Sequence, residues 1–161
     1  MMPVAGCSRL LDFSEQAIPL DAPIDGPFSP AACGYKEPND TVATAAPLTP
    51  EETGPAALCG TGDRDFYKIT VPAMTAEVEI RIAFTQRSNG DLDLRLTDKT
   101  GQMLLARSVG FGDAEAIVCP AASPLCPALA ADDYVFEVFP AATNMANAYT
   151  IAVGFTPSTA R

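Results

Sequence analysis

The sequence has 161 residues, the size of one domain with a single core. Asp and Glu outnumber Lys and Arg by 20 to 10, and the net charge of −10 argues against nucleic acid as a partner because like charges repel. The chain contains no His, which excludes the Ser-His and Cys-His nucleophile systems and removes the commonest general base.

The chain begins with a short segment that ends at Cys7. Residues Val4-Ala5-Gly6-Cys7 resemble the lipobox of bacterial lipoproteins, in which the cysteine becomes the lipidated first residue. The six residues before Cys7 are too few for the basic end and apolar run of a signal peptide, so we expect the natural start to lie upstream. Lipidation would place the chain in the extracytoplasmic cell envelope, attached to the membrane only through the lipid. A free cysteine near the chain end is the alternative.

A flexible tether is predicted after Cys7. Residues 8–32 carry four prolines and no sustained hydrophobic period, which is typical of a linker. We therefore divide the chain into a lipobox remnant and disordered tether over residues 1–32, a folded domain over residues 33–157 and a tail over residues 158–161.

From residue 33 onward apolar and polar residues alternate, which is the period of half-buried strands. Asp91, Asp93 and Arg95 are expected to face solvent. Further apolar runs at MLLARSV, EAIVC, YVFEVF and AYTIAVGF bring the number of strands to about eight and predict an all-β, jelly-roll-like β-sandwich. One helical turn is expected, with Asp40 or Thr41 as its cap. The stretches YKITV, EVEIRIAF and DLDLRL each present one apolar face, formed by Tyr67, Ile69, Val71, Val78, Ile80, Ile82, Phe84, Leu92, Leu94 and Leu96.

The five cysteines leave one unpaired, and Cys7 stands apart from the other four. Cys119 and Cys126 flank the Pro-containing loop PAASPL, which a local disulfide would close, and this pairing leaves Cys33 with Cys59. Disulfides persist outside the cytoplasm, which agrees with a lipidated chain. A metal cluster of four thiolates is the alternative, disfavoured because the sequence has no Cys-x-x-Cys pair.

Five motifs in order resemble a known family: EPND, GDRDFYKITVPA, NGDLDLRLTDKTG, DDYVFEVFP and AYTIAVGF, spread over about residues 35–156. The family is the bacterial pre-peptidase C-terminal domain, a β-sandwich appended to secreted proteases and related to the collagen-binding domains of clostridial collagenases. The resemblance implies a non-catalytic module and, in the collagenase branch, one that binds calcium. The two disulfides and the lipobox depart from that pattern.

Two acidic turns form the candidate metal site. A bridge between Cys33 and Cys59 would hold their Cα atoms about 5.5 to 6 Å apart and bring the EPND and GDRD turns together. Crowded carboxylates repel one another, and Ca²⁺ accepts six to eight oxygens from such turns, whereas Mg²⁺ keeps its waters. Thr61 is a further oxygen donor. Matched to the calcium-binding collagenase branch, the ligands are Glu37, Asn39, Asp40, Asp63 and Asp65.

Two alternatives stand beside this site. Asn39 and Asp40 would instead cap a turn while Asp63 and Asp65 remain solvated loop residues. Asp91 and Asp93 are a weaker candidate for a second ion, because carboxylates on an edge strand are usually solvated.

The resulting functional prediction is a monomeric, surface-anchored binding module for a protein or polysaccharide partner. The alternative is a structural or interaction domain of a larger surface assembly. A hydrolase built on paired carboxylates is disfavoured, because the acids lie in turns or alternate along strands with no Trp or nucleophile motif around them.

Overall fold

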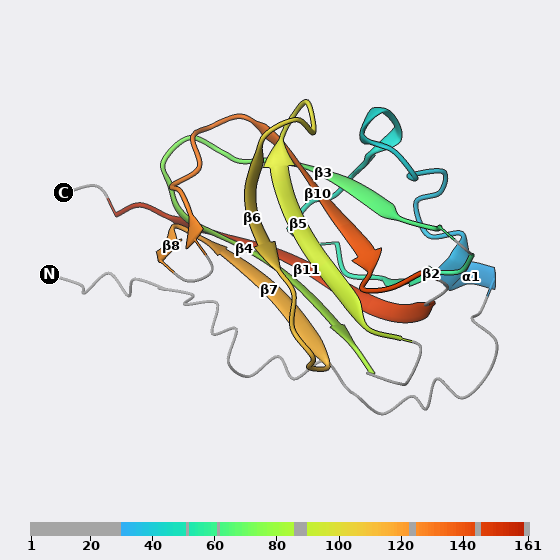
Figure 1. Ribbon diagram of the computed structural model, residues 1–161. Coiled ribbons are helices and arrows are strands. Elements are labelled where there is room, and N and C mark those ends of the chain that lie inside the picture. The colour runs from blue at the N-terminus through green and yellow to red at the C-terminus, as the bar shows by residue number, and fades with distance from the viewer. Residues whose placement is uncertain are drawn as a thin grey trace, which may run out of the picture.

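The protein folds as an all-β sandwich whose two sheets pack face to face (Figure 1). The computed structural model describes residues 30–159 except 51, 61, 86–89, 123–124 and 144–145. The predicted all-β class is therefore confirmed. Cys7 and the part of the predicted tether before residue 30 lie outside the described residues. No helix in the described ranges is long and apolar enough to cross a bilayer.

The first sheet has five strands in the order β1-β3-β10-β5-β6. Strand β1 runs parallel to β3, and the other neighbours are antiparallel. Strand β5 is thus an interior strand, between β10 and β6, and β6 is an edge strand. The bounds are β1 (Ala46–Pro47), β3 (Asp65–Thr70), β10 (Asp133–Pro140), β5 (Leu92–Asp98) and β6 (Leu104–Ser108).

The second sheet has four antiparallel strands in the order β2-β11-β4-β7. Its strands are β2 (Pro55–Leu58), β11 (Asn147–Pro157), β4 (Thr75–Phe84) and β7 (Ala114–Cys119). A separate ribbon pairs β8 (Ala121–Ala122) with β9 (Leu125–Cys126). The described chain has eleven strands against the expected eight or so, and the difference is the two-residue strands β1, β8 and β9.

The core lies between the sheets and is built by the predicted alternation. All ten residues expected on the dry faces are buried, from Tyr67 on β3 to Leu96 on β5. Burying a large apolar side chain contributes about 1.5 to 3 kcal/mol, so these faces hold the sheets together.

The prediction that Asp91 and Asp93 face solvent is wrong, since each is 7% exposed. Alternation placed Asp93 on the outer face of its sheet, where it pairs with Phe139 of β10. Because β5 lies between two other strands, neighbouring side chains cover an outward carboxylate that an edge strand would leave in water.

Residue 32, just before the predicted boundary at residue 33, already packs against the folded domain. Helix α1 (Pro30–Cys33) precedes the first turn, and Ala32 packs against Ala57 of β2 and Ala148 of β11. The expected helical turn is the 3-10 helix η1 (Val42–Thr44). Its cap is Thr41, whose hydroxyl accepts a hydrogen bond from the Thr44 backbone.

Both predicted cysteine pairs lie at disulfide distance. Cys33 and Cys59 are bonded with a Cα–Cα distance of 5.7 Å, joining α1 to the end of β2. Cys119 and Cys126 are bonded with a Cα–Cα distance of 5.0 Å, joining β7 to β9.

Candidate metal site

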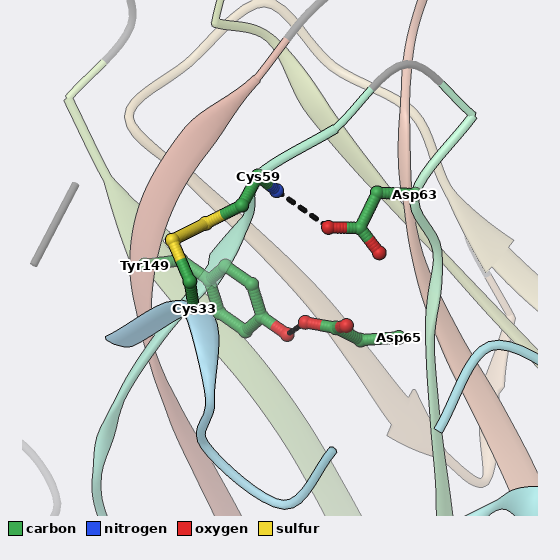
Figure 2. Close-up of a disulfide and its surroundings, with 5 residues drawn as sticks. All are labelled: Cys33, Cys59, Asp63, Asp65 and Tyr149. Carbon is green, nitrogen blue, oxygen red and sulfur yellow. Dashed lines mark hydrogen bonds between the residues drawn. A yellow bond between two sulfur atoms is a disulfide. The ribbon is translucent and has the colours of Figure 1, made fainter. Parts of the chain in front are cut away.

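The Cys33–Cys59 bridge links the chain just before the first acidic turn to the chain just before the second, and Figure 2 shows it beside Asp63 of the second turn. The first turn follows α1, and the second follows β2 and leads into β3. The Cys59 N–H donates to Asp63 Oδ2 at 2.5 Å, which fixes this carboxylate beside the disulfide. The Phe66 N–H donates to the Asn39 carbonyl at 2.8 Å, which ties the first turn to β3.

Three carboxylates meet where these turns converge. Glu37, Asp40 and Asp63 each offer one oxygen, and these oxygens lie within 4.8 Å of one another. No other set of three Asp, Glu or Cys side chains in the described ranges brings ligand atoms this close. Asp40 is exposed and the other two are partly buried, so the cluster is open to solvent.

The carboxylates of this cluster repel one another. Partial burial raises the pKa of Glu37, a hydrogen bond from the Asn39 backbone opposes that rise, and the charges of Asp40 and Asp63 add to it. The Asn39 N–H donates to Glu37 Oε2 at 2.9 Å. The group can therefore lower its free energy by binding a cation, which removes the repulsion.

The Asn39 side chain lies beneath this cluster and is completely buried. Oriented with its amide nitrogen toward the carboxylates, it donates to Asp65 Oδ1 at 3.2 Å and to Glu37 Oε2 at 2.9 Å. Of the five predicted ligands, the structure thus gathers Glu37, Asp40 and Asp63 at the surface. It places Asn39 and Asp65 below them as a second layer.

Asp65 is buried against the core and is only 2% exposed. Tyr149 on β11 donates its hydroxyl hydrogen to Asp65 Oδ2 (Figure 2), and the Tyr67 hydroxyl lies 3.4 Å from the same oxygen. Burial raises the pKa of Asp65 to about 7; the hydrogen bond from Tyr149 opposes this, and the charges of Asp63 and Glu37 add to it. A carboxyl group with this pKa suits a general acid, but one so deeply covered cannot contact a substrate.

The sequence contained a signal for the buried position of Asp65. Asp65 precedes the inward-facing Tyr67 by two positions and therefore shares its face. The buried role of Asn39 had no such signal, because it lies in an irregular turn. Thr61 lies outside the described residues.

The molecule is thus a two-sheet β-sandwich with a carboxylate cluster on disulfide-linked turns. Neither a family model nor a curated protein matches the sequence. Among solved structures, the pre-peptidase C-terminal domain of collagenase from Bacillus anthracis matches with a TM-score of 0.54 and 15% identity, covering 68% of this chain and 94% of that chain. This likeness concerns the fold, and it confirms the pre-peptidase C-terminal fold that the sequence motifs implied.

Proposed function

We propose that the protein is a non-catalytic, extracytoplasmic binding module that is stabilised by calcium and anchored by a lipid on Cys7. The observation that carries the proposal is the convergence of Glu37, Asp40 and Asp63 on disulfide-linked turns of a pre-peptidase C-terminal fold. Its partner is a protein or a polysaccharide at the cell surface.

Calcium suits the chemistry of this donor set. The three side chains supply only oxygen, carry three negative charges when ionised and project from turns. A calcium ion takes six to eight oxygens in flexible geometry and completes its shell with carbonyls and water. Magnesium demands a stricter octahedral arrangement and gives up its waters reluctantly, so it should substitute poorly.

A thermal unfolding experiment tests the calcium site. Calcium at a hundred times its dissociation constant stabilises the native state by about 2.7 kcal/mol, which raises the melting temperature by roughly 5 to 10 °C relative to excess chelator. Asp40→Asn and Asp63→Asn should shrink this rise. Glu77→Gln is the matched control, because Glu77 is an exposed carboxylate on β4 away from the cluster. An unchanged melting curve at millimolar calcium would contradict the site.

The lipid anchor is supported by the sequence alone, since Cys7 lies outside the described residues. Metabolic labelling with a fatty-acid probe, in the cells in which the protein is naturally made, should mark the protein. The label should disappear in Cys7→Ser. Labelling that persists in this variant would show that Cys7 is not the lipidated residue.

The binding role is supported by the fold and by the inaccessibility of Asp65 to a substrate. Cross-linking of the protein on the native cell surface should recover one saturable partner. A structural domain of a larger assembly is the alternative, and it would instead yield several neighbours in fixed ratios.

A further inference from the structure

The outer face of the first sheet carries a groove of about 320 Å³ over β10, β5 and β6. The candidate metal site uses none of its residues. The groove is lined by Arg95, Thr97, Gly101, Gln102, Leu104, Arg107 and Phe139. Arginine, polar and apolar side chains thus meet in one concave surface.

Three arginines lie on this face, and the buried carboxylates of Glu137 and Asp93 offset only part of their charge, although the whole chain carries a net charge of −10. Glu137, only 1% exposed, is held between the guanidinium groups of Arg64 and Arg95. Both guanidinium groups also lie over the Phe139 ring, at 5.6 and 6.0 Å from its centroid. Two arginines therefore share one buried carboxylate, and their own side chains are still about 40% exposed.

Arg107 adds a third positive charge beside this network. It pairs with Arg95 across the β5–β6 ladder, so the two like charges lie side by side on one face. Arg107 is exposed, and within the described ranges it makes no hydrogen bond or ion pair, although it influences Asp93 electrostatically. A bound anion would reduce the repulsion between Arg95 and Arg107.

An exposed apolar side chain lines the same groove. Leu104, at the start of β6, is 55% exposed. Exposed apolar side chains next to arginine are typical of protein interfaces. A sugar would instead need a free aromatic face, and Phe139, the aromatic residue of the groove, has its ring flanked by guanidinium groups.

Strand addition at the edge of β6 is a poor way to occupy this surface. The β5–β6 pairing contains a register shift, and a bulge of this kind blunts an edge against pairing. Ser108 at the end of β6 donates to Glu115 of β7 and accepts from the Ala116 N–H, so the edge is tied to the other sheet. A partner must therefore lie on the face of the sheet.

We propose that the groove over β5 and β6 docks an acidic segment of a partner polypeptide. Arg95 and Arg107 bind its carboxylate groups, and Leu104 contacts its apolar side chains. This inference rests on the proposed binding function and assigns that function a surface and a class of partner.

The proposal is tested in two steps. Peptides that bind the protein are first selected from a random dodecapeptide library, and the selected peptides are then synthesised and their binding site is mapped by nuclear magnetic resonance. The selected peptides should combine Asp or Glu with aliphatic residues, and their binding should perturb β5 and β6. Arg107→Gln should weaken the synthesised peptides about tenfold or more, since a charge-assisted pair is lost. Leu104→Ser should weaken them as well. Arg81→Gln is the control, because Arg81 is exposed on β4 of the other sheet.

Several outcomes would overturn the proposal: no enriched peptides, peptides that bind Arg107→Gln as well as the unaltered protein, or shifts that map elsewhere. Polygalacturonate binding that depends on Arg107 while peptides fail would identify a polysaccharide instead. A concentration-dependent dimer that Arg107→Gln abolishes in sedimentation would identify a second copy of the chain. Surface cross-linking distinguishes a failure of this docking surface from a failure of the proposed binding function. If Arg107→Gln retains the cross-linked partner as well as the unaltered protein does, the binding function stands and only the assignment of this surface is wrong.

Discussion

The hydroxyl oxygens of Tyr67 on β3 and Tyr149 on β11 lie 2.8 Å apart and join the two sheets inside the core. Each hydroxyl has one hydrogen to donate. While Asp65 is ionised, Tyr149 gives its hydrogen to Asp65, and Tyr67 is then the donor in the bond between the tyrosines. This chain of hydrogen bonds, from Tyr67 to Tyr149 to Asp65, supplies a donor to the buried carboxyl group directly below the acidic turns.

The direction of the chain predicts unequal effects of two similar substitutions. Tyr149→Phe removes the principal donor to Asp65 and should lower the free energy of unfolding by about 2 to 3 kcal/mol. Tyr67→Phe leaves that donor in place and should cost about 1 kcal/mol. Denaturant unfolding of both variants at one pH above 7, where Asp65 is ionised, measures both losses. Equal losses, or a larger loss for Tyr67→Phe, would show that the chain does not run in this direction.

Much of the fold could be predicted from the sequence because alternation is local. The parity that buries Tyr67 and Ile69 needs no knowledge of neighbouring strands. Strand order is not local, and this is why Asp91 and Asp93 were wrongly predicted to face solvent. Alternation with the inward-facing leucines of β5 correctly placed them on the outer face, but it could not show that neighbouring strands cover that face. The acidic turns were predicted to converge because the cysteine pairing was predicted. Their separation into a surface layer and a buried layer depends on packing around Asn39.

The buried carboxyl group of Asp93 should make stability depend on pH. Burial raises the pKa of Asp93 to about 6, repulsion from Asp91 and Glu115 adds to the rise, and Arg107 opposes it. The folded pKa thus lies above the ordinary value of 3.8, so the folded state binds this proton more tightly than the unfolded chain does. The contribution is present below about pH 4 and is lost as pH rises through about 6.

Asp93→Asn should remove that dependence. At pH 7.5 the variant should be more stable than the unaltered protein by about 1 to 3 kcal/mol, and the difference should fade as the pH approaches 4. Denaturant unfolding at several pH values measures it, and Glu77→Gln provides an exposed carboxylate for comparison. A difference that stays constant from pH 4 to 7.5 would contradict the raised pKa.

The ion network around Glu137 predicts a second asymmetry. Glu137→Gln leaves Arg95 of β5 and Arg64, just before β3, without their carboxylate and should cost about 2 to 4 kcal/mol. Arg64→Gln should cost less, because Arg95 still pairs with Glu137. Thermal and denaturant unfolding of both variants would decide the order. A larger loss for Arg64→Gln would mean that Arg95 contributes little to holding the buried charge.

The two disulfides should differ in their effect on calcium binding. Cys33 and Cys59 are 26 positions apart, and replacing both by Ser should cost about 3 to 4 kcal/mol, mainly because the unfolded chain gains freedom. Cys119 and Cys126 are 7 positions apart, and replacing both should cost about 2 to 3 kcal/mol. The two losses are close enough for the second pair to serve as a matched control.

Only the first bridge joins the turns that carry Glu37 and Asp63, and the Cys59 N–H holds the Asp63 carboxylate. The calcium-dependent rise in melting temperature should therefore shrink strongly in Cys33→Ser/Cys59→Ser, because binding must then bring the turns together as well. The rise should stay unchanged in Cys119→Ser/Cys126→Ser, whose bridge lies between β7 and β9. Calorimetric titration of calcium at a temperature where both variants are folded measures the affinity directly. Equal affinities in the two variants would mean that the turns are positioned by the sandwich itself, and the disulfide would then stabilise the fold without organising the metal site.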